Sequence, residues 1–314
     1  MSRALPICLA HELAQRPPAE RWLVEGLWAE QAVGIVGGQP KCFKSWLALD
    51  LAVSVASGTP CLRRYATSRP GPVLLYAAED ALHVVRERLE GICAAAAVSL
   101  KRLPLHVITS PVLRLDLEPD RDALATAVER LQPRLLVLDP FVRLHRVDEN
   151  QAGEVAPLLA YLRELERRFA TSVLLVHHAG KGGHARAGQA LRGSSEFHAW
   201  GDSNLYLRRK GTELTLTVEH RASSAPPSLA LELRESGSGI SLVVAGNGAP
   251  AQAPPRLAAR QRVLDALAEA GEPLAVRQLR ERSRIRTATL CDLLRQLVED
   301  GEVIKSALGY APAR

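Results

Sequence analysis

The sequence predicts an α/β fold: a mainly parallel sheet, antiparallel strands at one edge, and a small second domain at the C-terminus. Short apolar runs at 32–36, 73–77, 135–138 and 173–176 are typical of parallel strands that are buried on both faces. Amphipathic stretches separate these runs. Strands that alternate with helices imply right-handed crossovers within one sheet.

Composition divides the chain into four segments. Residues 1–31 form a lead-in, and residues 32–244 hold the strands and helices of the α/β domain. After residue 202 polar and apolar residues alternate, which predicts the antiparallel edge strands. Residues 245–255 are rich in Ala, Gly and Pro and indicate a linker. Residues 256–314 return to helical periodicity.

Charge and cysteine content exclude several classes of protein. Forty Lys and Arg against 34 Asp and Glu give a net charge of +6, which permits nucleic-acid binding without requiring it. The apolar runs are far shorter than the ~20 residues of a membrane span, and the N-terminus lacks a cleavable apolar segment. We therefore expect a cytoplasmic protein without a membrane partner. Five scattered cysteines without a CxxC pair disfavour a disulfide framework and a structural zinc site.

A phosphate-binding loop is predicted directly after the first strand. The segment GGQPKCFKS lies between the strand VGIV and the helix SWLALDLAVSVASG. Backbone N–H groups at a helix N-terminus face anionic oxygens, and the helix dipole adds positive potential. In this interpretation Lys44 reaches the β- and γ-phosphates of ATP, and Ser45 binds Mg²⁺. The candidate cofactor-binding residues are Gly38, Gln39, Pro40, Lys41, Cys42, Phe43, Lys44, Ser45 and Trp46.

One position departs from the consensus G-x-x-x-x-G-K-[ST]. Phe43 stands in the place of the second glycine. A Cβ restricts the backbone there, which predicts a differently shaped loop or a slow turnover of ATP. The structural alternative is a Gly-Pro turn in which Lys44 holds no ligand. The strand before the loop and the helix after it favour nucleotide binding.

Two later strands end in acidic residues, at the edge where open parallel sheets bind ligands. Glu79 is the candidate catalytic base that activates the attacking water. Asp139 ends an apolar run in a Walker B pattern and is the candidate Mg²⁺ ligand, together with Ser45. The structural alternatives are a helix cap formed at Asp80 and a turn formed by the Asp-Pro dipeptide.

The fourth strand ends in two histidines, and a basic Gly-rich stretch follows. His178 is the candidate that senses a γ-phosphate, the alternative being a purely structural histidine pair. Adjacent side chains of an extended strand point in opposite directions, which disfavours a metal site here. Lys181 and Arg186 are candidate contacts to a DNA backbone, or else part of a solvated loop. Arg192 is a candidate arginine finger for a neighbouring subunit's nucleotide.

Five motifs occur in a fixed order: GGQPKCFKSWLALDLA, YAAED, LLVLDPFVRLH, VHHAGKGG and RGSS. Together they resemble the RepA-type hexameric replicative helicases of mobilisable plasmids, within the RecA/DnaB-like P-loop ATPases. The resemblance covers about residues 20–235. It implies a RecA-like core that forms a homo-hexamer or another homo-oligomeric ring, with ATP bound between subunits. It also implies site residues: Lys44 and Ser45 as the Walker A pair, Glu79 as the catalytic base, Asp139 as the Walker B acid, His178 as the phosphate sensor and Arg192 as the finger.

The C-terminal segment departs from the plasmid helicase pattern. Residues 256–314 predict three helices and a short β-hairpin, an order that resembles a winged helix-turn-helix. Its candidate DNA contacts are Arg284, Arg286 and Arg295. The alternative is a module that docks a protein.

The predicted function is that of an ATP-dependent DNA motor: a RepA-like ring helicase or replication protein. Single-stranded DNA would pass through the ring channel, and the winged helix would bind duplex DNA. The alternative is an ATP-gated DNA-binding regulator, whose core switches its assembly state without unwinding DNA.

Overall fold

The chain consists of two compact units, residues 1–251 and residues 252–314. The first unit holds an α/β fold, and the second holds three helices and a β-hairpin. The structure is a computed structural model that describes residues 7–13, 17, 20–178, 196–224, 226–236, 239–246, 255–283, 285, 287–299, 301–306 and 309–313.

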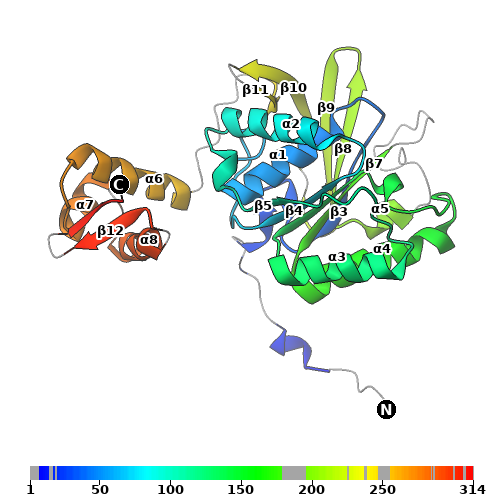
Figure 1. Ribbon diagram of the computed structural model, residues 1–314, viewed down its shortest axis with the longest axis horizontal. Helices are drawn as coiled ribbons and strands as arrows, with labels where there is room; N and C mark the ends of the chain where they lie inside the picture. The colour runs from blue at the N-terminus through cyan, green and yellow to red at the C-terminus, as the bar shows by residue number, and fades with distance from the viewer. Residues whose placement is uncertain are drawn as a thin grey trace. The chain divides into compact units, whose positions relative to one another are not determined.

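A nine-stranded sheet runs through the first unit (Figure 1). The strands from β8 to β5 pair in parallel, and β9, β10 and β11 extend the sheet with antiparallel pairs. The predicted α/β class with antiparallel edge strands is therefore confirmed. In spatial order the strands are β11 (Gly239–Val244), β10 (Leu229–Ser236), β9 (Glu213–His220), β8 (Ser203–Lys210), β3 (Val33–Gly38), β7 (Ser172–His178), β6 (Leu135–Asp139), β4 (Val73–Ala77) and β5 (Leu105–Val107).

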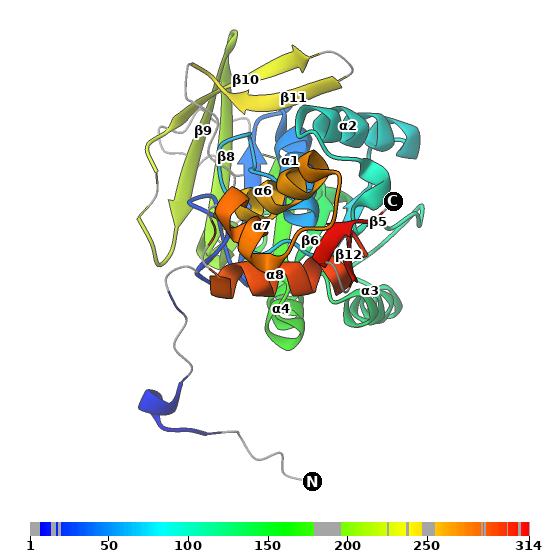
Figure 2. The ribbon, with the colours of Figure 1, turned by 90° about the vertical axis from the view of Figure 1, so that its left-hand side faces the viewer.

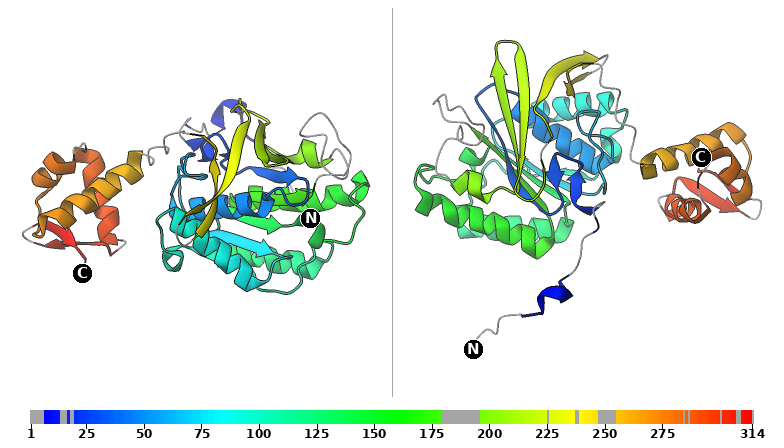
Figure 3. Two further views of the ribbon diagram at one scale, coloured as in Figure 1. Left: turned by 90° about the horizontal axis from the view of Figure 1, so that it is seen from above. Right: turned by 180° about the vertical axis from the view of Figure 1, so that it is seen from behind.

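Helices cover both faces of this sheet, as Figures 1 and 3 show. Because neither face meets water, β3 and β6 are buried at every position, and their sequences are continuous apolar runs without alternation. Separate apolar cores lie on the two faces. One face is covered by α1 (Lys44–Ser57) and α2 (Leu82–Ala95), and the other by α3 (Glu118–Leu131), α4 (Ala152–Phe169) and the short α5 (Glu196–Trp200).

Strand β8 differs from the expectation for an antiparallel edge. It pairs in parallel with β3 and antiparallel with β9, so the antiparallel part of the sheet begins one strand later. Residues Ser203 to Leu207 are all buried because β8 lies inside the sheet. Alternation in the sequence detected the strand but could not identify its neighbour, since pairing direction depends on residues far away in the chain.

Several elements were not apparent in the sequence. Strand β5 has only three residues, too few for a pattern. The inward positions of α3, Leu124 and Val128, recur at a spacing of four, a signal that could have predicted it. Within the predicted lead-in, Leu23 and Trp28 are buried in the core, because their hairpin packs on the α/β unit. Among its described residues, this unit also contains β1 (Trp22–Val24), β2 (Trp28–Ala29) and the 3-10 turns η1 (Ala10–Glu12), η3 (Leu100–Arg102) and η4 (Phe141–Arg143).

Strand register brings the polar strand ends to one edge of the sheet. Gly38 of β3 lies opposite His178 of β7, and Ala77 of β4 lies opposite Asp139 of β6. All of these strands are parallel, so their carboxyl ends point the same way. At the β11 edge of the sheet, β11 lies beside α2 (Figure 2).

The second unit has an apolar core of its own, which includes Val263, Leu279, Leu290 and Leu297. Its order of three helices and a hairpin is the one expected for a winged helix-turn-helix, an assignment that stays a prediction. Its elements are α6 (Pro255–Ala270), α7 (Val276–Ser283), α8 (Thr287–Glu299), β12 (Val303–Ser306) and β13 (Gly309–Pro312).

Within the described ranges, no helix combines the length and the apolar composition that crossing a membrane requires.

Candidate functional site

The loop between β3 and α1 is tightly packed and partly left-handed in its backbone. A Cβ on Gly38 would lie 2.4 Å from the carbonyl oxygen of Leu207 and 2.6 Å from Sγ of Cys42, so only glycine fits there. Phe43 has φ 65° and ψ 29°, the left-handed region that glycine enters freely. Phe43 thus replaces the consensus glycine but has a left-handed backbone. For a residue with a Cβ, this conformation costs about 1–2 kcal/mol.

Lys44 lies inside this loop and is only 5% exposed. Its Nζ donates a hydrogen bond to the carbonyl oxygen of Gln39 at 2.8 Å and lies 3.9 Å from Sγ of Cys42. Burial lowers the pKa of Lys44, while Cys42, Asp139 and Glu79 oppose that change. The loop thus holds a largely desolvated cation within electrostatic reach of both acidic candidates.

Asp139 and Ser45 form the candidate metal-binding pair. Asp139 is buried, and burial raises its pKa to about 6; a hydrogen bond with the Ser45 side chain opposes this rise, while Asp80 and Glu79 add to it. A buried carboxylate whose charge is disfavoured fits a hard divalent cation, and hydroxyl and carboxylate oxygens are ligands that Mg²⁺ accepts. No group of three or more His, Cys, Asp or Glu side chains suited to a metal occurs among the described residues. Mg²⁺ would therefore take its other ligands from water and from the nucleotide phosphates.

Glu79 extends from the end of β4 and is exposed. Its Oε1 lies 3.0 Å from Nε of Arg143, which belongs to the turn after β6. Asp80, next to it, pairs with Arg88 of α2. Asp80 makes no side-chain cap on that helix. The two adjacent acids thus have separate partners, and Glu79 faces the edge that carries the loop.

His178 lies at the end of β7, opposite the first residues of the loop. Burial lowers its pKa, the charges of Lys44 and His177 lower it further, and Glu79 and Glu149 oppose the change. This shift favours the neutral imidazole, a form that can donate to a phosphate oxygen without carrying a fixed charge.

Glu149, His145 and His177 form a buried polar cluster that the sequence analysis did not predict. Oε1 of Glu149 lies 3.5 Å from Nε2 of His145 and 3.5 Å from Nε2 of His177. Burial raises the pKa of Glu149, but the two imidazoles outweigh it and lower that pKa to about 2. Phe141 and Phe197 pack on the His177 ring. No sequence pattern joins residues 149 and 177, so only the folded chain shows the pair.

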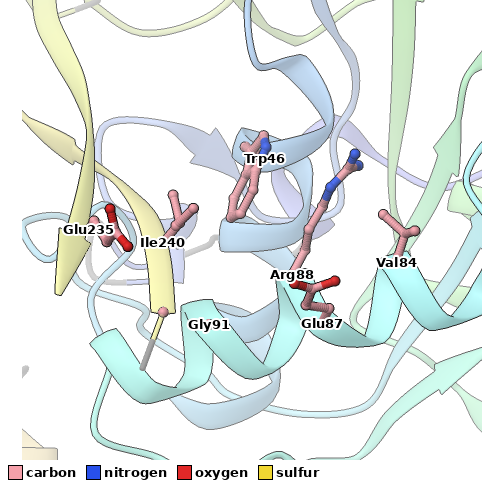
Figure 4. A pocket seen from close by; sticks show the side chains of 8 residues that line it. Trp46, Val84, Glu87, Arg88, Gly91, Glu235 and Ile240 are labelled. Carbon is pink, nitrogen blue, oxygen red and sulfur yellow. The ribbon is translucent and has the colours of Figure 1, made fainter. Parts of the chain in front are cut away.

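A pocket of about 390 Å³ opens beside the start of α1. Figure 4 shows Trp46 and Arg88 near the centre of the view, with Glu235 and Ile240 to their left. The Arg88 guanidinium lies 5.7 Å from the centroid of the Trp46 ring, a cation–π contact. Trp46 directly follows the predicted Walker A pair in the chain and is the residue of α1 that lines this pocket.

Of the other predicted site residues, the structure describes only Arg295. Lys181, Arg186, Arg192, Arg284 and Arg286 fall outside the described residues. Arg295 is exposed on α8, 3.8 Å from a carboxylate oxygen of Asp292. It lines a groove of about 380 Å³ in the second unit, together with Cys291, Leu294, Val298, Lys305 and Tyr310.

Comparison with protein families agrees with this geometry. A family model described as an AAA domain, AAA_25, matches residues 2–184, more than half of the chain. The chain belongs to this AAA family. The match makes the first unit an ATPase domain of that type and supports a nucleotide as its ligand.

Solved structures share the fold at low sequence identity. The ATPase domain of G40P is 11% identical with a TM-score of 0.52, and the match covers 68% of this chain and 86% of that one. A DnaB-like replicative helicase, described with its interactions with primase, is 10% identical with a TM-score of 0.50, covering 68% of this chain and 57% of the other. These matches confirm the RecA/DnaB-like fold that the motifs indicated, whereas RepA-type membership stays a prediction.

The Glu149 cluster generates a prediction about stability. A carboxyl whose pKa falls from 4.5 to about 2 on folding stabilises the protein above pH 4.5, and this contribution disappears as pH falls toward 2. Glu149→Gln should therefore lower the free energy of unfolding by about 1–3 kcal/mol at pH 7. Urea unfolding at pH 7 and pH 3.5 should show a smaller difference from wild type at the lower pH.

Glu129→Gln is the matched control, because the exposed ion pair of Glu129 with Arg168 contributes little. An equal loss for Glu149→Gln at both pH values would contradict the charged role of Glu149.

Proposed function

We propose that this protein is an ATP-dependent DNA motor, a RepA-like ring helicase or replication protein that hydrolyses ATP at subunit interfaces. The observation that supports it most strongly is the convergence of four side chains around one loop. Lys44 comes from the loop, and Glu79, Asp139 and His178 come from the ends of three neighbouring strands. The charges of Asp139 and Glu79 affect the pKa of Lys44, and the charges of Lys44 and Glu79 affect the pKa of His178, which supports the proposal of a common site.

Each side chain has a separate task in this proposal. Lys44 exchanges its hydrogen bond with Gln39 for the β- and γ-phosphates, and the loop N–H groups hold the remaining oxygens. Glu79 orients the attacking water and accepts its proton. His178 donates to a γ-phosphate oxygen, so its hydrogen bond is lost when the phosphate leaves. Mg²⁺, held by Ser45 and Asp139, would neutralise charge on the phosphates.

A ring that moves on DNA needs contacts between subunits and to the strand. Arg192 is proposed as the finger that reaches the neighbouring nucleotide, and Lys181 and Arg186 as contacts to single-stranded DNA in the channel. The second unit is proposed as a winged helix that binds duplex DNA through Arg284, Arg286 and Arg295. The positive charge of the chain supports these roles.

One observation favours a second function, an ATP-gated DNA-binding regulator. Arg143 contacts Oε1 of Glu79 at 3.0 Å, so Glu79 would have to leave this ion pair or act through its other oxygen to serve as the base, which favours slow hydrolysis. Slow hydrolysis would suit a core that switches its assembly with ATP. Unwinding of a forked duplex separates the two functions. Strand separation that requires ATP supports the motor, and ATP-dependent DNA binding without strand separation supports the regulator.

Glu79→Gln should reduce ATP hydrolysis by about 10²-fold or more while ATP binding stays near the wild-type level, because the amide keeps the shape and loses the base. Lys44→Ala should lose both binding and hydrolysis, since it removes the point charge at the phosphates. Equilibrium binding of a fluorescent ATP analogue and steady-state phosphate release measure the two effects. Unaltered turnover in Lys44→Ala would reject the loop as the nucleotide site, and equal loss of binding in Glu79→Gln would make Glu79 structural.

The pocket beside α1 is proposed as the site of the purine base, stacked on Trp46. Trp46→Ala should weaken ATP binding about tenfold, because a stacked base loses its platform. Binding of inorganic tripolyphosphate, which has no base, should change little. Calorimetry with both ligands measures this, with Trp46→Phe as the control that keeps a ring. Equal losses for ATP and tripolyphosphate would mean that Trp46 supports the loop and holds no base.

Replacing Arg284, Arg286 and Arg295 together by Ala should weaken duplex binding in the full chain. It should also lower the slope of log affinity against log salt by roughly one unit for each phosphate contact removed. Fluorescence anisotropy on duplex and single-stranded DNA at several salt concentrations measures both effects. The matched control replaces three exposed cations of the first unit, Lys101, Arg102 and Arg130. Unchanged duplex binding would favour protein docking, and an equal loss in the control would show a general charge effect.

A further inference from the structure

Two residues of the phosphate loop hold backbone conformations that side chains disfavour. Lys41 has φ 61° and Phe43 has φ 65°, both in the left-handed region. Strained residues of this kind persist only where the surrounding structure holds them. Neither residue is a glycine, so the loop needs an external contact that makes this conformation the preferred one.

Arg209 supplies contacts to both strained residues. Its guanidinium carbon lies 5.2 Å from the centroid of the Phe43 ring, a cation–π geometry. Its Nη1 donates a hydrogen bond to the carbonyl oxygen of Lys41 at 3.4 Å. Nε of the same side chain donates to the carbonyl oxygen of Gly211 at 3.2 Å, which anchors the guanidinium to the β8–β9 turn. One side chain thus connects the loop to a neighbouring hairpin.

Strand pairing explains why Arg209 reaches the loop. Strand β8 runs parallel to β3, with Leu207 opposite Gly38 at the point where β3 ends. The chain of β8 continues past this point, so a residue two positions further on projects beside the loop. The partly buried Phe43 ring packs against the core on one side and faces Arg209 on the other.

We propose that Arg209 is a positioning residue for the phosphate loop, and that the pair Arg209–Phe43 replaces the second glycine of the consensus. A glycine permits the left-handed backbone; here the ring and the guanidinium stabilise it. This inference rests on the proposed function only in taking the loop to be the nucleotide site. Arg209 acts through the loop and need not touch the nucleotide.

The proposal has a measurable consequence for affinity. Apparent affinity falls in proportion to the fraction of molecules whose loop has the binding-competent conformation. Loss of Arg209 lowers this fraction, so KM for ATP rises while kcat at saturating ATP is retained. Phe43→Gly removes the strain at residue 43 together with the ring, so in that background Arg209 keeps only its long hydrogen bond to the carbonyl oxygen of Lys41.

A double-mutant cycle tests the pairing. The full-length wild type, Arg209→Met, Phe43→Gly and the double variant are titrated with ATP and with inorganic tripolyphosphate. Arg209→Met should weaken both ligands about three- to fivefold in the wild-type background, and less than about twofold in the Phe43→Gly background. The control is Arg208→Met, which removes the adjacent exposed arginine on the opposite side of β8. An equal loss in both backgrounds would overturn the proposal, because Arg209 would then attract the phosphates directly.

A second measurement does not depend on nucleotide binding. Hydrogen exchange of the nucleotide-free protein should be faster at residues 38–43 in Arg209→Met than in the wild type, and unchanged in Arg208→Met. Equal exchange rates in all three proteins would overturn the proposal even if Phe43→Gly fails to fold. A wild type that binds neither ATP nor tripolyphosphate would reject the proposed function, while the exchange rates would still decide the role of Arg209.

Discussion

The close approach of β3 to β8 is the constraint on which the candidate site depends. A Cβ on Gly34 would lie 1.7 Å from the carbonyl oxygen of Ser203, and one on Gly38 would lie 2.4 Å from that of Leu207. Two positions without side chains therefore let the strands pair along the whole length of β3. With β8 on one side and β7 on the other, the end of β3 has fixed neighbours. His178 lies on the β7 side and Arg209 on the β8 side.

The site concentrates groups whose charged forms are disfavoured in the folded chain. Burial lowers the pKa of Lys44 and raises that of Asp139. The charged form of each group is therefore less stable in the protein than in water. A triphosphate and a divalent cation would supply the opposite charges that these two residues lack. Binding of these ligands would then offset the electrostatic cost of burying Lys44 and Asp139, which links affinity for the nucleotide to stability of the fold.

Local patterns in the sequence predicted the parts of the fold and site that are local. The four buried strands, the loop and the acids at strand ends follow from residues adjacent in the chain, and Glu79, Asp139 and His178 do converge at one edge. Pairs from distant segments were not predictable in the same way. The contact of Glu149 with His177 and that of Trp46 with Arg88 arise from packing between different elements. The parallel pairing of β8 also depends on distant residues, so alternation predicted the strand without identifying its neighbour.

Phe43 shows that the requirement at this point of the loop is a dihedral angle and not a residue type. The backbone there has the left-handed conformation whether or not a glycine provides it. Branching at Cβ would make that angle far harder to reach, so Val, Ile and Thr are the residues that this position excludes most strongly. A search pattern that demands the second glycine will pass over chains of this kind. Such loops are better recognised by their backbone conformation, together with an aromatic residue before the lysine and a cation on the adjacent strand.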